Sequence, residues 1–258
     1  MKRLLLITVV CLTGFSLPAQ QVQKVKVLTY NIHHGENMKG LPDIQGIANV
    51  ILATNPDLVA LQEVDSVTQR TQNTDQLKEL AAITGMYTYF AKAMNFDGGG
   101  YGTGILSRFP ITEASTLSLP SVSKNEVEPR VAGIVTVKLP GDSLLQFISA
   151  HLDAERPAAN RIAQAKQLVA YFKETQTPVI LAGDFNAIPA SKEIHTLKKL
   201  FADATQQMGP TFPADSPKVK LDYIMVHPQN RWNVTGARII EEAVASDHRP
   251  LLSELELK

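Results

Sequence analysis

The chain has 258 residues, of which 44% are hydrophobic, so it is long enough to bury a large core as a single domain. Its 25 basic residues balance 25 acidic ones. Proteins that bind nucleic acid by neutralising phosphates usually carry a basic excess, so this balance argues against a long duplex as substrate, although a local patch or a metal can supply charge.

Residues 1–20 have the pattern of a secretory signal peptide. Lys2 and Arg3 precede a short apolar run, and small and polar residues follow it. The run is shorter than the roughly 18 residues expected of a membrane-spanning helix. We therefore predict a secreted or periplasmic protein in which residues 21–258 form one domain. Removing residues 1–20 leaves 23 basic and 25 acidic residues, a net charge of −2, and no cysteine, which excludes thiolate chemistry and disulfides.

The first half of the chain predicts strands interrupted by two helices. Asp43 precedes apolar residues at helical spacing and is expected to cap that helix at its start, whereas Gly85 is expected to close the next helix. The glycine triplet at 98–100 is expected to form a mobile loop. In chain order we expect a strand at 24–30, a helix at 44–52, a strand at 57–61, a helix at 74–84, and strands at 87–91 and 104–107.

The second half contains more strands than helices. Apolar residues at helical spacing predict a long amphipathic helix at 156–174. The other expected elements are strands at 131–137, 144–150, 179–182, 221–226 and 233–240 and a helix at 191–200. Because neighbouring strands often have no helix between them, we predict two packed sheets flanked by helices rather than one doubly wound sheet.

Carboxylates, amides and imidazoles recur where a predicted strand ends. Strand ends are the places where side chains of layered α/β folds converge on a site. Oxygen ligands suit a hard cation such as Mg²⁺, and a nearby histidine suggests proton transfer. Taken singly, each residue has an ordinary explanation as a solvated acid, a turn amide or a structural histidine. Their recurrence is the signal, and the candidates are Asn31, Glu63, His151, Asp184, Asn186, Asp247 and His248.

Asp222 interrupts an otherwise apolar predicted strand, Leu221–Val226. A buried carboxylate needs a hydrogen-bond donor. His248 is the best candidate, and such a pair would fix the tautomer of the imidazole and raise its basicity.

Taken in order, these segments resemble the endonuclease/exonuclease/phosphatase superfamily, which has the DNase I-like fold. The resemblance extends from about Val25 to Leu255. The matching segments are Leu28–Ile32, Leu61–Val64, Tyr101–Pro110, Glu128–Arg130, His151–Asp153, Gly183–Asn186, Leu221–Ile224 and Ser246–Pro250.

The resemblance implies a four-layered α/β sandwich in which two mixed sheets pack face to face between helices, with the site at one end. It implies that Glu63 is the principal ligand of Mg²⁺ or Mn²⁺, helped by Asn31 and Asp247. Asp184 and Asn186 would orient the attacking water and the phosphate. His248, held by Asp222, would act as general base or phosphate contact, and His151 would donate to a phosphate oxygen or the leaving group. Tyr101 and Arg130 would bind substrate.

The leading hypothesis is therefore a metal-dependent hydrolase of phosphate esters. The substrate stays open among nucleic acid, a phospholipid headgroup and an inositol phosphate or similar metabolite. No basic, aromatic-rich insertion for a duplex is visible, and the chain resembles the compact secreted members found in bacteria. We expect a monomer. The alternative is a non-catalytic ligand-binding protein that retains the fold.

Overall fold

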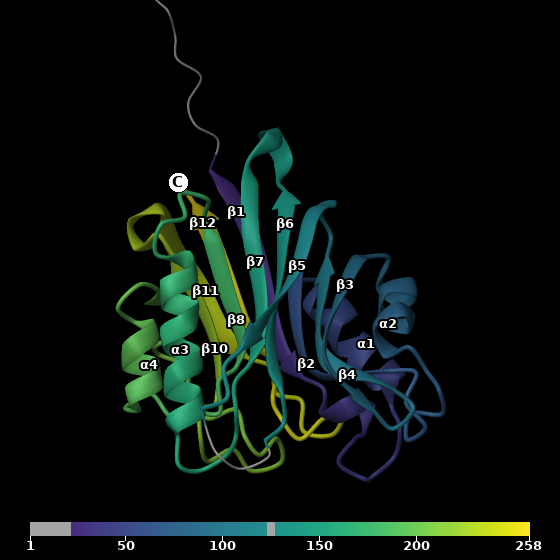
Figure 1. Cartoon of the computed structure of the whole chain (residues 1–258). Coiled ribbons are helices and arrows are strands. Elements are labelled where there is room, and N and C mark those ends of the chain that lie inside the picture. The colour runs from purple at the N-terminus through teal and green to yellow at the C-terminus, as the bar shows by residue number, and fades with distance from the viewer. Residues whose placement is uncertain (1–21, 123–126) are drawn as a thin grey trace, which may run out of the picture.

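Two six-stranded sheets pack face to face in the computed structural model, which describes residues 22–122 and 127–258 (Figure 1). The expected signal peptide at residues 1–20 lies outside the described residues. Among those described, no helix is long and apolar enough to cross a membrane.

The first sheet joins both ends of the described chain. Its strands, in spatial order, are β11 (Trp232–Ile239), β12 (Leu251–Leu257), β1 (Gln23–Asn31), β2 (Leu58–Ser66), β4 (Gly99–Ser107) and β3 (Tyr87–Phe96). Only β1 and β2 run parallel in this sheet as described; its other pairs are antiparallel.

The second sheet is built from the middle of the chain. Its strands, in spatial order, are β5 (Ile111–Leu119), β6 (Arg130–Lys138), β7 (Leu144–His151), β8 (Val179–Asp184), β10 (Asp222–His227) and β9 (Ala202–Asp203). Again one described pair, β7 with β8, is parallel.

Helices cover the outer faces and complete four layers. An apolar cluster joins α1 (Ile44–Thr54) and α2 (Gln76–Thr84) to the first sheet, and another joins α3 (Ala159–Phe172) and α4 (Lys192–Leu197) to the second. A third cluster fills the space between the sheets. Three short 3₁₀ turns are η1 (His33–Gly35), η2 (Pro140–Asp142) and η3 (Gln229–Arg231). The predicted sandwich is confirmed.

The predicted helix ends are also confirmed. The Asp43 carboxylate accepts a hydrogen bond from the Gly46 amide at 2.8 Å, which satisfies a free donor at the start of α1. Gly85 ends α2 with a φ of 69°, a left-handed conformation that glycine adopts without steric cost.

Two expectations about the strands are wrong. Gly99 and Gly100 begin β4 instead of forming a loop. A Cβ on Gly99 would lie 2.2 Å from the Ser66 carbonyl oxygen, so glycine is needed there for close backbone approach. The sequence analysis also did not predict β5 and β12. Strand β5 is mostly exposed and polar, and the leucine and glutamate residues of β12 favour a helix in isolation.

Candidate active site

Sheet register brings the polar strand ends together. His151 lies opposite Asp184 across the parallel pair β7–β8, and Asp222 lies opposite Asp184 across β8–β10. Asn31 ends β1 in the facing sheet, where it pairs with Gln62, the residue before Glu63. Residues that are far apart in sequence therefore meet at one end of the sandwich.

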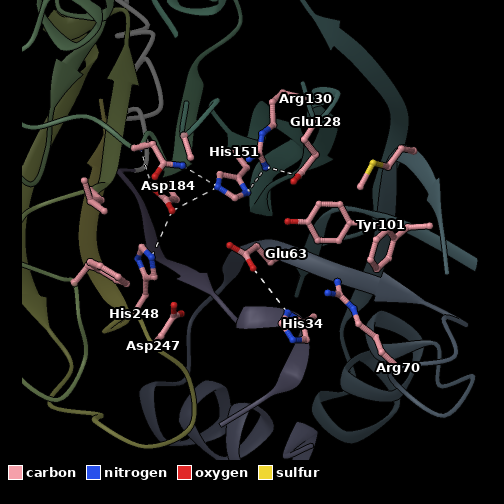
Figure 2. Close-up of a pocket in the computed structure, with 16 residues that line it drawn as sticks. His34, Glu63, Arg70, Tyr101, Glu128, Arg130, His151, Asp184, Asp247 and His248 are labelled. Atoms are coloured by element: carbon pink, nitrogen blue, oxygen red, sulfur yellow. Dashed lines mark hydrogen bonds and ion pairs between the residues drawn. The ribbon is translucent and has the colours of Figure 1, made fainter. Parts of the chain in front are cut away.

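These side chains surround one cavity of about 400 Å³ (Figure 2). Asn31 and Asp222 lie behind its wall, bonded to residues that line it. All ten residues predicted from the sequence are thus brought together. The eight that line the cavity are Glu63, Tyr101, Arg130, His151, Asp184, Asn186, Asp247 and His248.

Glu63 reaches the cavity because β2 is irregular at this point. The register between β2 and β4 shifts between Leu61 and Val64, and Glu63 has a φ of 57°. A left-handed conformation costs a residue other than glycine on the order of 1 kcal/mol, and it turns this side chain away from the regular strand alternation. Asn31 Nδ2 donates to Glu63 Oε1 at 3.0 Å. Burial opposes ionisation, but the nearby His34 ring and the hydrogen bond from Asn31 hold the pKa of Glu63 well below its usual range.

His248 lies between two buried carboxylates. Its Nδ1 is 2.9 Å from Asp222 Oδ2, and its Nε2 is 3.6 Å from Asp184 Oδ2. Burial disfavours the charged imidazole, but the Asp222 and Asp184 charges outweigh it and raise the pKa of His248 to about 10. Burial raises the pKa of Asp184 to about 7, although the His248 charge opposes this shift. The protein alone therefore favours an imidazolium at this position.

His151 is the opposite case. Arg130 Nη1, held by Glu128 at 2.8 Å, lies 3.0 Å from His151 Nδ1. Burial and the Arg130 charge hold the pKa of His151 well below its usual range, so the ring is neutral. A guanidinium can only donate, so Nδ1 accepts from Arg130 and the neutral ring carries its proton on Nε2. Nε2 then cannot accept a hydrogen bond from the Asn186 amide nitrogen, which lies 3.0 Å away. Nε2 lies 3.6 Å from Asp184 Oδ2, so the N–H is directed toward the centre of the site (Figure 2).

Asn186 is held by the turn after β8. Its backbone N–H donates to Asp184 Oδ1 at 2.8 Å, and its Nδ2 lies 3.0 Å from both Leu152 O and His151 Nε2. The Asp184 side chain thus forms an Asx-turn, and this turn places the Asn186 amide beside His151.

Several groups of side chains offer ligands for a cation, among them His33, His34 and Glu36, whose potential ligand atoms lie within 4.8 Å of one another. Asp184, Asp222 and His248 have potential ligand atoms within 4.8 Å of one another, but Oδ2 of Asp222 and Nδ1 of His248 already bond to each other. Glu63 and Asp247 instead present carboxylates to the open cavity, and Glu63 is ionised. Oxygen ligands of this kind fit a hard divalent cation.

Asn31 is arranged differently from the expected ligand. Its Nδ2 donates to Glu63 and to Asp184 Oδ2 at 3.2 Å, and its Oδ1 accepts from the His33 amide at 3.0 Å. In this conformation the amide positions two carboxylates, and its own oxygen is already bonded.

Three ionisable residues that line the cavity were not predicted: His34, Arg70 and Glu128. His34 and Glu128 lie inside or beside motifs noted in the sequence, so proximity was an available signal. Arg70 lies in the turn after β2 and carries no local signal. Its partner Asp65, a fully buried acid at the end of a strand, implied a cation somewhere.

A model of the endonuclease/exonuclease/phosphatase family matches residues 28–248. The chain belongs to this family. Its members are hydrolases that act on phosphate esters and typically depend on a metal. The chain is 29% identical over 266 residues to the uncharacterized protein YbhP of Escherichia coli K12. The alignment covers 93% of this chain and 100% of YbhP.

Solved structures share the fold. The endonuclease/exonuclease/phosphatase from Bacteroides vulgatus has a TM-score of 0.76 at 21% identity, covering 91% of this chain and 99% of that one. The mannosyl-6-phosphatase Bt3783 of Bacteroides thetaiotaomicron has a TM-score of 0.71 at 19% identity, covering 90% and 99%. Likeness at these identities establishes the family fold alone.

Proposed function

We propose that the protein hydrolyses phosphate esters in the 400 Å³ cavity with the help of Mg²⁺ or Mn²⁺. The observation that carries this proposal is the placement of one carboxylate, Asp184, between a neutral and a charged imidazole. A proton acceptor and two N–H donors then face the same point, as attack of water on a phosphate requires.

Each side chain has a role that its environment favours. Asp184, with a pKa raised to about 7, would accept a proton from the attacking water. His248 as imidazolium and His151 through Nε2–H would donate to phosphate oxygens or to the leaving oxygen. Glu63 and Asp247 would hold the cation, which lowers the negative charge that builds up on the phosphate.

Three further residues would bind or position the substrate. Arg130 fixes the tautomer of His151, and Asn186 is placed to donate to a phosphate oxygen. Tyr101 lines the same cavity, where burial raises its pKa, so its hydroxyl stays neutral.

The test is hydrolysis of p-nitrophenyl phosphate and bis-p-nitrophenyl phosphate by residues 21–258. We expect activity with Mg²⁺ or Mn²⁺, its loss with EDTA, and recovery when the metal is restored. A panel of plasmid DNA, RNA, sphingomyelin and inositol phosphates would define the natural ester. Failure to hydrolyse any ester by a folded protein would favour the non-catalytic alternative.

We also propose that the protein acts outside the cytoplasm, on the pattern of residues 1–20. Fractionation of cells that express the full chain tests this proposal. Retention of residues 1–20 in a cytoplasmic protein would contradict it.

A further inference from the structure

A second cavity of about 280 Å³ adjoins the first, and His34 and Arg70 line both. His34 Nδ1 lies 3.9 Å from Glu63 Oε2, and its Nε2 lies 3.7 Å from Glu36 Oε2, which lines the second cavity. The second cavity therefore begins one side chain away from Glu63, within reach of a group attached to a phosphate in the first.

Arg70 is held rigidly at this junction. Its Nε and Nη2 donate to the two oxygens of the fully buried Asp65 carboxylate at 2.6 and 2.8 Å. Its guanidinium carbon lies 4.5 Å from the centre of the Phe96 ring. Across the described residues its remaining nitrogen, Nη1, makes no hydrogen bond, and 32% of the side chain is exposed. A pre-oriented donor of this kind loses little entropy when it binds an oxygen atom of a ligand.

The second cavity combines this donor with acceptors. Glu36, Asp43 and Glu79 contribute carboxylates, and Gln72 and Thr74 contribute groups that both donate and accept. Among its described lining residues there is no lysine, phenylalanine, tyrosine or tryptophan.

This lining selects one class of group. A second phosphate would be repelled by Glu36 and Glu79. Among the described lining residues of the second cavity, a nucleobase could stack only on the His34 imidazole. Pro42 and Ile44 give the wall an apolar part, but an acyl chain that filled the cavity would also bury the carboxylates of Glu36 and Glu79. A hydroxyl accepts from arginine and donates to a carboxylate, so several hydroxyls on one small molecule satisfy donor and acceptors together.

We propose that Arg70 is a specificity-determining residue that donates to a hydroxyl of the substrate, and that the substrate is the phosphate ester of a polyhydroxy alcohol such as a sugar. This inference rests on the proposed function. The phosphate lies in the first cavity and the polyol extends past Arg70 into the second.

The test compares glucose 6-phosphate with p-nitrophenyl phosphate, which carry rings of similar size with and without hydroxyls. The readout is the ratio of their kcat/KM values. Arg70→Lys keeps a positive charge beside Asp65 but loses the planar guanidinium and its additional N–H donors. We therefore expect this ratio to fall about 10-fold or more, chiefly because KM for glucose 6-phosphate rises. Equal losses for both substrates would reduce Arg70 to a structural residue and overturn the inference.

Two further variants distinguish a loss of substrate specificity from a loss of folding. Glu79 is exposed on α2 and lines only the second cavity, so Glu79→Leu should lower the same ratio in a folded protein. Arg238 is an exposed arginine on β11 that pairs with Glu254 and lines neither cavity. Arg238→Gln should therefore leave the ratio unchanged. A Glu79→Leu ratio equal to that of the wild type would contradict the second cavity as a polyol site.

Activity of the wild-type protein distinguishes failure of this inference from failure of the proposed function. Hydrolysis of p-nitrophenyl phosphate without hydrolysis of glucose 6-phosphate, glycerol 3-phosphate or an inositol phosphate would overturn the inference and leave the proposed function standing. Hydrolysis of no ester would reject both.

Discussion

His248 and Asp222 form a buried pair in which Nδ1 and Oδ2 are 2.9 Å apart, as expected from the isolated carboxylate in an apolar strand. The other oxygen of Asp222, Oδ1, has no hydrogen-bond partner among the described residues. The pair therefore depends on one contact, and that contact leaves Nε2 of His248 directed toward Asp184.

The first prediction is that Asp222→Asn lowers kcat far more than it raises KM. Loss of the carboxylate removes both the orientation and the charge that hold the imidazolium, and these matter chiefly in the transition state. The matching change in a hydrolase triad costs on the order of 10⁴-fold, and cation assistance should make the loss here smaller. Steady-state kinetics on bis-p-nitrophenyl phosphate checks this, and a near-normal kcat would refute it.

The same variant should change how the stability of the metal-free protein depends on pH. In the native state Asp222 and Asp184 raise the pKa of His248 from its ordinary 6.5 to about 10. The resulting stabilisation is complete below pH 6.5 and is lost as pH rises through 10. We expect the free energy of unfolding in EDTA, measured with urea, to fall across this window in the wild type and less steeply in Asp222→Asn. If the free energy of unfolding depended on pH in the same way in both proteins, Asp222 would not raise the pKa of His248.

Glu63→Gln should leave the fold intact and abolish metal-dependent activity. Glutamine keeps the shape of the side chain but loses the negative charge that a hard dication requires. Calorimetric titration with Mn²⁺ should show weaker binding, while circular dichroism stays unchanged. Glu174→Gln is the matched control, because this glutamate side chain is 84% exposed at the end of α3. Full activity of Glu63→Gln at saturating Mg²⁺ would remove Glu63 from the cation site.

Arg130→Met should raise the pKa of His151. Burial would still oppose protonation, but the positive charge that helps keep the ring neutral would be gone. Nitrogen NMR of the metal-free protein reads both the pKa and the tautomer. Arg130→Lys retains the charge and should shift the pKa less. An unchanged His151 signal in Arg130→Met would show that Arg130 does not control the ring.

Gly102→Ala should destabilise the protein by about 1–3 kcal/mol, because a Cβ would lie 2.1 Å from the Ala91 carbonyl oxygen and force the β3–β4 pair apart. Gly209→Ala is the control, since nothing lies within 4 Å of a Cβ built there. Urea denaturation measures both. Equal stability of the two variants would show that β3 and β4 move apart without cost.

Several features of this protein follow from short stretches of sequence. The caps of α1 and α2 depend on neighbouring residues, so Asp43 and Gly85 were predictable. A polar residue directly after an apolar run marks a strand end wherever the strand lies, and parallel pairing then places such ends at one edge. His151 and Asp184 could therefore be identified together before their sheet was known.

Other features are decided only by tertiary structure, because they depend on which segments become neighbours. Strand β12 is recognisable only once β1 and β11 pair with it on either side. The neutral state of His151 comes from burial beside Arg130, and the charged state of His248 comes from Asp222 and Asp184, although both residues are histidines at strand-end motifs. Arg70 enters the site only because Asp65 is buried and β3 brings Phe96 against its guanidinium. The sequence determined which chemical groups are available, and the packing of two sheets determined their charge, direction and neighbours, since electrostatic energies depend on distance and burial rather than on order along the chain.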